Sequence, residues 1–241
     1  MRKLLTVAVA ATATLALTTA GLAAVEPNDS EGTLNVTATP KDSGTKRKPK
    51  NLKVGFDLKV DKPGTTVEVI EMLLPKGTKI SGKGFKKCNA DDLVATGPTG
   101  CSSGSKAGPK GTANAKVGPQ GAPLNLDVFP FVEDANTLLF YLAQQGGGVQ
   151  TVVKGEITNS GRKMAITIPG ELRKPGGLDA TLTAINQTFS GKRKSNYIVS
   201  STACPKGGWK FGGNLVFATD RVDGAPAPTD ETRESVVKCT K

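Results

Sequence analysis

Apolar and polar residues alternate along several short stretches of this chain. The clearest case is residues 52–60, Leu-Lys-Val-Gly-Phe-Asp-Leu-Lys-Val, where apolar side chains occupy nearly every second position. A period of two places one set of side chains on one face of a β-strand. We therefore predict a half-buried strand at residues 52–60, and a first strand at residues 33–38, which alternate in the same way.

Nine further stretches have the composition of strands and are separated mostly by short turns. They are residues 65–74, 124–132, 137–143, 149–158, 163–168, 181–190, 196–203, 209–218 and 235–240, with a loop rich in Ala, Pro and Asp at 221–232. About eleven closely spaced strands without intervening helices favour antiparallel pairing. The predicted fold is an all-β, antiparallel two-sheet β-sandwich of the jelly-roll or Ig-like kind.

One short helical turn is expected near residues 89–93. Asn89 is a good N-terminal cap, Asp91 and Asp92 would lie near the positive end of the turn, and Leu93 would point inward. The predicted core consists of large apolar residues of the strands, namely Phe56, Leu58, Ile70, Phe129, Phe131, Leu138, Phe140, Ile166, Ile168, Phe189, Ile198, Phe211 and Phe217.

The first 23 residues have the pattern of a signal peptide. Arg2 and Lys3 precede an apolar run over residues 4–17, and Gly21-Leu22-Ala23 supplies small residues for cleavage. The alternative is a retained membrane anchor, which this short run followed by acidic residues disfavours. We expect a signal peptide at 1–23, a disordered tail at 24–32, and a single β-sandwich domain at 33–241 of a secreted, extracellular protein. Loose association with the cell wall is an open alternative.

Four cysteines in an exported chain predict two disulfides. Three pairings are open; Cys88–Cys101 and Cys204–Cys239 close the shortest loops and are preferred. A metal site is not expected, because the chain has no histidine and no Cys-x-x-Cys motif.

The chain is strongly basic, with a formal net charge of +11. Without residues 1–23 it keeps 30 Lys and Arg against 21 Asp and Glu, a net charge of +9. The excess favours anionic partners such as cell-wall polymers or lipid head groups, although charge also serves plain solubility. The candidate anion-binding residues form three clusters: Lys46, Arg47 and Lys48; Lys83, Lys86 and Lys87; Lys192, Arg193 and Lys194. The sequence does not decide whether they share a face, and scattered solvated turns are the simpler expectation.

No motif supports catalysis. Residues 100–104, Gly-Cys-Ser-Ser-Gly, match a nucleophile elbow, and residues 103–106 match Ser-x-x-Lys. The elbow needs a strand before it, a helix after it and a histidine, and a Ser–Lys pair needs a desolvated lysine. Both matches lie in a Gly-rich loop, where chance explains them better.

Residues 77–84, Gly-Thr-Lys-Ile-Ser-Gly-Lys-Gly, fall one residue short of a phosphate loop, since Gly84 replaces the magnesium-binding hydroxyl. The acidic pairs are Glu68 with Glu71, Asp91 with Asp92, and Glu133 with Asp134. Sugar clefts and single-stranded nucleic acids both need aromatic platforms, but the chain has one Trp and two Tyr. We expect no enzymatic activity, no cofactor and no nucleic-acid partner.

The segment from Cys88 to Val117 carries a resemblance. After Cys88 it reads Gly-Cys-Ser-Ser-Gly-Ser-Lys-Ala-Gly over residues 100–108, followed by a strand of small residues. It resembles a group of uncharacterised exported β-sandwich proteins of high-GC Gram-positive bacteria, in which a Cys precedes Ser-x-x-Gly and a small-residue strand. Ser102 stands where that group often has Pro. The resemblance implies secretion and a β fold and brings no known activity.

Three functions therefore remain open. The first is a secreted non-catalytic protein that binds anionic components of the cell envelope through basic loops. The alternatives are a secreted hydrolase using serine or carboxylates, and a carrier of a small apolar ligand held between the sheets. A deep pocket with paired polar residues would favour the hydrolase, and an open apolar cavity would favour the carrier.

Overall fold

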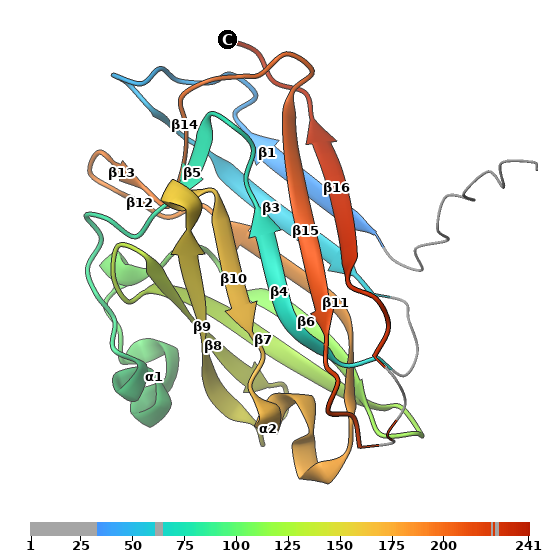
Figure 1. The fold of residues 1–241 in the computed structure, drawn as a ribbon. Coiled ribbons are helices and arrows are strands. Elements are labelled where there is room, and N and C mark those ends of the chain that lie inside the picture. The colour runs from blue at the N-terminus through green and yellow to red at the C-terminus, as the bar shows by residue number, and fades with distance from the viewer. Residues whose placement is uncertain (1–32, 61–64, 223, 225–226) are drawn as a thin grey trace, which may run out of the picture. The chain divides into compact units, whose positions relative to one another are not determined.

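A computed structural model describes residues 33–60, 65–222, 224 and 227–241 of the chain. The predicted signal peptide and tail lie outside these residues. Eleven of the strands within them form one antiparallel sheet (Figure 1), whose order is β1 (Leu34–Thr39), β3 (Lys53–Lys59), β11 (Ala180–Phe189), β6 (Gly111–Val117), β7 (Ala122–Val132), β8 (Thr137–Gln144), β9 (Gln150–Thr158), β10 (Lys163–Thr167), β4 (Val67–Leu73), β15 (Trp209–Phe217) and β16 (Glu231–Val237).

This main sheet curls until its two ends meet. The Val36 amide of β1 donates to the Ser235 hydroxyl of β16 at 3.0 Å, and the two strands lie side by side in Figure 1. β4 pairs with both β10 and β15, so the sheet is continuous around the molecule. The all-β antiparallel fold is confirmed, but the arrangement is a nearly closed, barrel-like sheet and not clearly a two-sheet sandwich. The twist accumulated over many strands is what brings the edges together.

Five short strands form two small sheets beside the main one. β2 (Lys50–Asn51), β14 (Val199–Ser201) and β5 (Thr78–Ile80) make one, and β12 (Lys192–Arg193) with β13 (Asn196–Tyr197) makes the other. The strand predicted at 196–203 is thus two short pieces outside the main sheet. Ile198 lies between these two pieces and is fully buried, as an inward-facing residue of the predicted strand would be.

The last strand begins earlier than the predicted 235–240. β16 starts at Glu231, within the stretch interpreted as loop. Its polar residues are accommodated because Arg233, only 7% exposed, donates to the Lys59 carbonyl and pairs with Glu231. A charged residue at a buried position hides the alternation on which the prediction depends.

One part of the sheet interior is filled by aromatic rings. Phe56 makes edge contacts with Phe189 at 6.1 Å and with Phe211 at 5.9 Å between ring centroids, and Phe140 meets Phe189 at 6.2 Å. These four rings are at most 4% exposed. Of the predicted core, only Phe129 and Ile168 are half-buried; the others are buried. Trp209, fully buried, was missing from that prediction.

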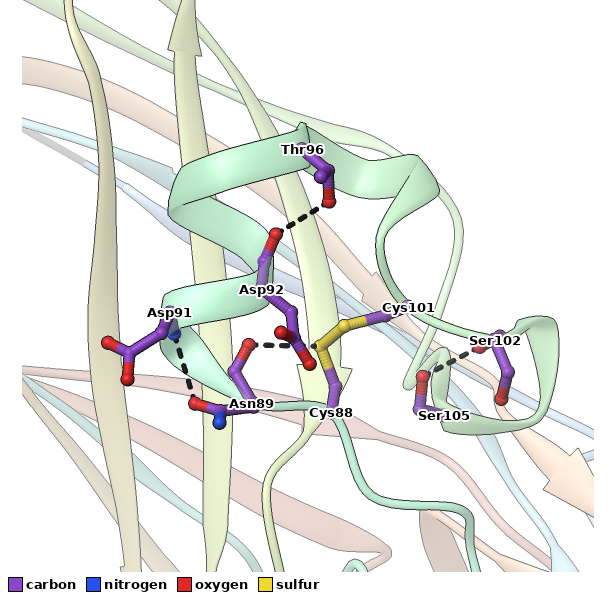
Figure 2. The surroundings of a disulfide bond; sticks show 8 residues. All are labelled: Cys88, Asn89, Asp91, Asp92, Thr96, Cys101, Ser102 and Ser105. Carbon is purple, nitrogen blue, oxygen red and sulfur yellow. Dashed lines mark hydrogen bonds between the residues drawn. A yellow bond between two sulfur atoms is a disulfide. The ribbon is translucent and has the colours of Figure 1, made fainter.

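A second, smaller core lies on the outer face of β7 and β8. There Leu93 of α1 (Ala90–Thr96) packs with Phe131, Leu139 and Tyr141, all of them buried. The helix begins as predicted: the Asn89 side chain accepts from the Asp91 amide at 3.0 Å, and both aspartates lie in the first turn (Figure 2). The predicted turn at 89–93 is confirmed and continues to Thr96.

Both preferred disulfides are confirmed. Cys88–Cys101 closes the segment that carries α1, as Figure 2 shows. Cys204–Cys239 ties the chain that follows β14 to the chain that follows β16. Such links stabilise a fold chiefly by restricting the unfolded chain. Two disulfides are compatible with an extracellular location.

Candidate functional site

The main sheet encloses an apolar cavity of about 100 Å³. An apolar cavity of similar size, about 150 Å³, stays dry and binds benzene in another protein. The wall is apolar except for Arg173 and Gln187; its other members are Val67, Ile70, Met72, Ala113, Ala115, Leu124, Leu126, Val128, Phe140, Leu142, Val153, Ile166, Ile168, Leu172, Ala180, Leu182 and Ile185.

Small side chains on one side of the wall leave this space open. Ala113 and Ala115 are alternate residues of β6, and the nearby strand β11 adds Ala180. Ala115 pairs with Leu124 on β7 and Leu182 on β11, so larger side chains surround it. A leucine at position 115 would project into the cavity, because paired residues of neighbouring strands share one face.

A short helix closes one end of the cavity. Leu172 and Arg173 of α2 (Gly170–Arg173) both belong to the wall, and Leu172 is buried. The Arg173 guanidinium donates from Nε to the Ile168 carbonyl at 3.1 Å and from Nη1 to Asp220. Its charge is therefore paired within the protein and does not face the cavity as a ready anion site.

Asp220 holds the same helix through a second cation. Lys174, at the end of α2, donates to its carboxylate at 3.0 Å. The hydrogen bonds from Lys174 and Arg173 lower the pKa of Asp220 to about 2. The carboxylate is thus ionised at any pH near neutrality, and it links α2 to the segment after β15.

Gln187 is the uncharged polar residue of the wall. The residue is 1% exposed, and its side-chain Nε2 donates to the Thr188 carbonyl at 2.9 Å and the Pro109 carbonyl at 3.2 Å. Its Oε1 is buried and has no hydrogen-bond partner among the described residues. Buried polar atoms are nearly always paired, so this unpaired carbonyl oxygen is an exception.

Two of the three basic clusters meet on one surface, which we call the basic surface and define as Lys83, Lys86, Lys87, Lys192, Arg193 and Lys194. The Arg193 guanidinium donates from Nη1 to the Gly84 carbonyl at 2.6 Å. A Cβ added at Gly104 would lie 3.3 Å from Lys86 and 3.6 Å from Arg193. All five lysines are exposed, while Arg193 is half-buried and joins the two loops.

The third cluster lies across the three-stranded sheet from the basic surface. Lys46, Arg47 and Lys48 precede β2 and are exposed. β14 pairs with β2 on one side and with β5, which leads to Lys83, on the other. The structure therefore joins two clusters directly and sets the third beyond a narrow sheet, where simple scatter had been expected.

The motifs that suggested chemistry fall in unsuitable places. A 3-10 turn over Gly97–Thr99 precedes Cys101, where an elbow would have a strand. Ser103 and Lys106 of the Ser-x-x-Lys match are both exposed, so the lysine lacks the desolvation that such a pair needs. Residues 78–80 of the phosphate-loop-like stretch are the strand β5, so no loop cradles a phosphate there.

Two of the three acidic pairs have one member in an ion pair with a lysine. Glu71 accepts a hydrogen bond from Asn214 and pairs with Lys163 at 2.5 Å, and the hydrogen bond from Lys163 lowers its pKa. Glu133 pairs with Lys154 at 2.8 Å. Across the described residues, no group of three or more His, Cys, Asp or Glu is arranged to hold a metal ion.

Comparisons of the chain with protein-family models, with curated proteins and with solved structures found no match. In the described part of the chain, no helix has the length and apolar character needed to cross a membrane.

The sequence analysis raised an apolar carrier as an alternative, but it identified neither the residues of the cavity wall nor Gln187. A signal for Gln187 was present, because it alternates with Ile185 and Phe189 on β11 and so occupies an inward-facing position. Polar residues are uncommon at buried, inward-facing positions, so a glutamine at such a position is informative. The alternate alanines of β6 were a weaker signal, since small inward residues are also found in tightly packed sheets.

Proposed function

We propose that this protein binds a small apolar molecule inside its main sheet, as a non-catalytic carrier. The observation that supports the proposal is the cavity itself, whose wall is apolar at every position but two. Transfer of an apolar molecule from water into a cavity of this character is favourable. The engagement of Arg173 with Asp220 favours a neutral occupant over an anion.

Binding of toluene to the disulfide-bonded protein tests this proposal. Saturable binding followed by calorimetry or by methyl chemical shifts is the expected result. An Ala115→Leu variant would fill the space and weaken toluene binding by roughly tenfold or more, because the added carbons overlap the ligand.

The matched control is Lys116→Leu, which adds the same side chain at the exposed neighbouring position of β6. This variant should bind toluene as the native protein does. The proposal fails if the native protein shows no saturable binding, or if Ala115→Leu and Lys116→Leu behave alike.

A second candidate function is supported by the basic surface. We propose that it binds anionic envelope components, because the Arg193–Gly84 hydrogen bond brings six basic residues together. Each lysine close to an anionic lipid surface contributes about 1 kcal/mol, and salt screens this attraction. The two candidates are compatible, since a carrier that delivers or collects a ligand at an envelope needs to stay near it.

Co-sedimentation with lipid vesicles tests the second candidate. The protein should bind vesicles rich in phosphatidylglycerol and should not bind neutral vesicles. Binding to the phosphatidylglycerol vesicles should fall as the salt concentration rises. The double variant Lys86→Gln with Lys192→Gln should weaken it about thirtyfold, the sum of about 1 kcal/mol per lysine. Lys53→Gln with Lys116→Gln removes equal charge elsewhere and should change little; equal losses in both would assign the effect to net charge alone. A soluble anionic polymer that competes would point to wall polymers instead.

A further inference from the structure

A cleft of about 700 Å³ lies between two loops that are distant in sequence. One wall is residues 204–208, which lead into β15, and the other is residues 238–241, which follow β16; Figure 1 shows the C-terminal end beside the loop before β15. Lys206, Lys238 and Lys241 belong to these walls, and none of the described residues that line the cleft is an Asp or Glu. The cleft shares no wall residue with the apolar cavity or with the basic surface.

A disulfide and a close backbone contact fix the two walls relative to each other. The Cys204–Cys239 bond joins one wall to the other. Gly208, at φ 100°, lies against the end of β16, where an added Cβ would stand 2.6 Å from the Val237 carbonyl oxygen. A side chain at position 208 would therefore push the loop away from β16. The cleft thus has its shape before any ligand arrives.

The lysines of the cleft carry charge that the described residues do not neutralise. Elsewhere on the surface lysines pair with carboxylates, as Lys110 does with Asp127 at 2.9 Å. Lys206 and Lys238 are exposed and have no ion pair among the described residues. A concave surface lined by charges of one sign concentrates the electrostatic field and raises the local concentration of counter-ions. Lys241 ends the sequence, so the argument rests on the other two lysines.

We propose that the cleft binds a small soluble molecule through a phosphate or diphosphate group. Lysine ammonium groups are common phosphate ligands in proteins, where they act as point charges. Lys206 and Lys238 come from opposite walls, so an anion with two or more negative charges gains from both. A flat bilayer does not enter a concave surface, which favours a soluble anion over a membrane. The site is independent of the carrier function and of the basic surface.

Titration of the native, disulfide-bonded protein with pyrophosphate tests the proposal. We expect saturable binding by calorimetry, with amide chemical shifts that change at residues 204–208 and 238–241, and weaker binding as salt rises. The double variant Lys206→Gln with Lys238→Gln should weaken binding about tenfold. Lys53→Gln with Lys116→Gln removes equal charge from exposed strand positions and should change the affinity by less than about twofold.

A second variant, Cys204→Ser with Cys239→Ser, keeps every lysine and releases the two walls from each other. It should weaken pyrophosphate binding by about threefold or more, because the walls must then be ordered on binding. If circular dichroism shows that this variant does not fold, the two lysine variants decide the question.

The proposal is wrong if the native protein shows no saturable binding, or if the shifts that change lie outside the two walls. It is also wrong if both lysine variants lose affinity equally, since net charge alone would then explain binding. Vesicles rich in phosphatidylglycerol should not displace pyrophosphate from the cleft. Displacement would replace the soluble ligand by a lipid head group and overturn the assignment.

Discussion

Two parts of the same sheet interior are built in opposite ways. In one part, Phe56, Phe189 and Phe211 pack edge to face and leave the rings at most 4% exposed. In the other, Ala113, Ala115 and Ala180 border open space, and Phe140 lies where the two parts meet. The strand β11 runs through both, from Ala180 to Phe189.

The difference shows that burial and close packing are separate properties of this fold. The aromatic part contributes stability, because large rings bury much apolar area and gain from their edge contacts. The alanine-lined part forgoes packing energy and keeps a volume open. Under the proposed carrier function, the part of the interior that stabilises the fold is separate from the part that would hold a ligand.

The strongest test of this comparison is Phe189→Ala in the aromatic part. The variant should lose about 3–5 kcal/mol of unfolding free energy, because a buried ring is removed and a new cavity remains. Urea unfolding followed by circular dichroism measures this loss. Phe129→Ala, at a half-buried position of the outer face, is the matched control and should lose less. Equal losses of unfolding free energy in the two variants would show that the aromatic part contributes no more to stability than the outer face does.

Leu172→Ala in α2 should have a smaller effect on stability and a larger one on access to the cavity. We expect a loss of about 2 kcal/mol, at the low end for a buried leucine because the site already borders open space. Toluene should also exchange faster, as measured by NMR line shapes. Leu178→Ala, 47% exposed, should change stability by less than about 0.5 kcal/mol. Unchanged exchange in Leu172→Ala would place the entrance elsewhere.

Ala115→Leu should change the unfolding free energy in the opposite direction to Phe189→Ala. Filling the open space is expected to raise the unfolding free energy by about 0.5–2 kcal/mol, as cavity-filling changes commonly do. Urea unfolding beside Lys116→Leu gives the comparison. A loss of several kcal/mol in Ala115→Leu alone would mean that the alanine-lined part is already fully packed.

The smallest effect concerns the ionic link of α2. Lys174 and Arg173 lower the pKa of Asp220 to about 2. The stabilisation that the Asp220 carboxylate gives to α2 is therefore complete above the ordinary pKa of 3.8 and is lost as the pH falls from there towards 2. Amide hydrogen exchange of Leu172 and Lys174, corrected for intrinsic rates, should therefore accelerate over that interval.

In Asp220→Asn, the amides of α2 should exchange as fast at neutral pH as they do in the native protein at low pH. Their corrected exchange rates should no longer depend on pH. Asp92→Asn in α1 is the control and should leave α2 unchanged. Persistent pH dependence in Asp220→Asn would assign the effect to other carboxylates, and the link between α2 and Asp220 would then be unimportant for closing the cavity.

Local patterns in the sequence were sufficient for much of the fold. Residues 52–60 alternate, and β3 follows them; Asn89 was a recognisable cap, and α1 begins after it. The nearest cysteines pair, as loop length favours. These features depend on neighbours in the chain, which is why a single sequence reveals them.

The features that depend on distant residues could not be predicted. Closure of the sheet requires β1 to meet β16, and the basic surface requires Arg193 to reach Gly84. The cavity arises only when folding places the alanines of β6 beside the larger side chains of β7 and β11. Gln187 was visible as an inward polar residue, but only the folded structure shows that its Oε1 lacks a partner.

The meeting of β1 and β16 also bears on how this protein behaves in concentrated solution. The outer strands of an open sheet expose unpaired amides and carbonyls that can recruit strands of other molecules. Here the two outer strands of the main sheet face each other, and the Ser235 hydroxyl bridges them. The curl that creates an interior therefore also brings the two outer strands of the main sheet against each other, where they are less available to other molecules.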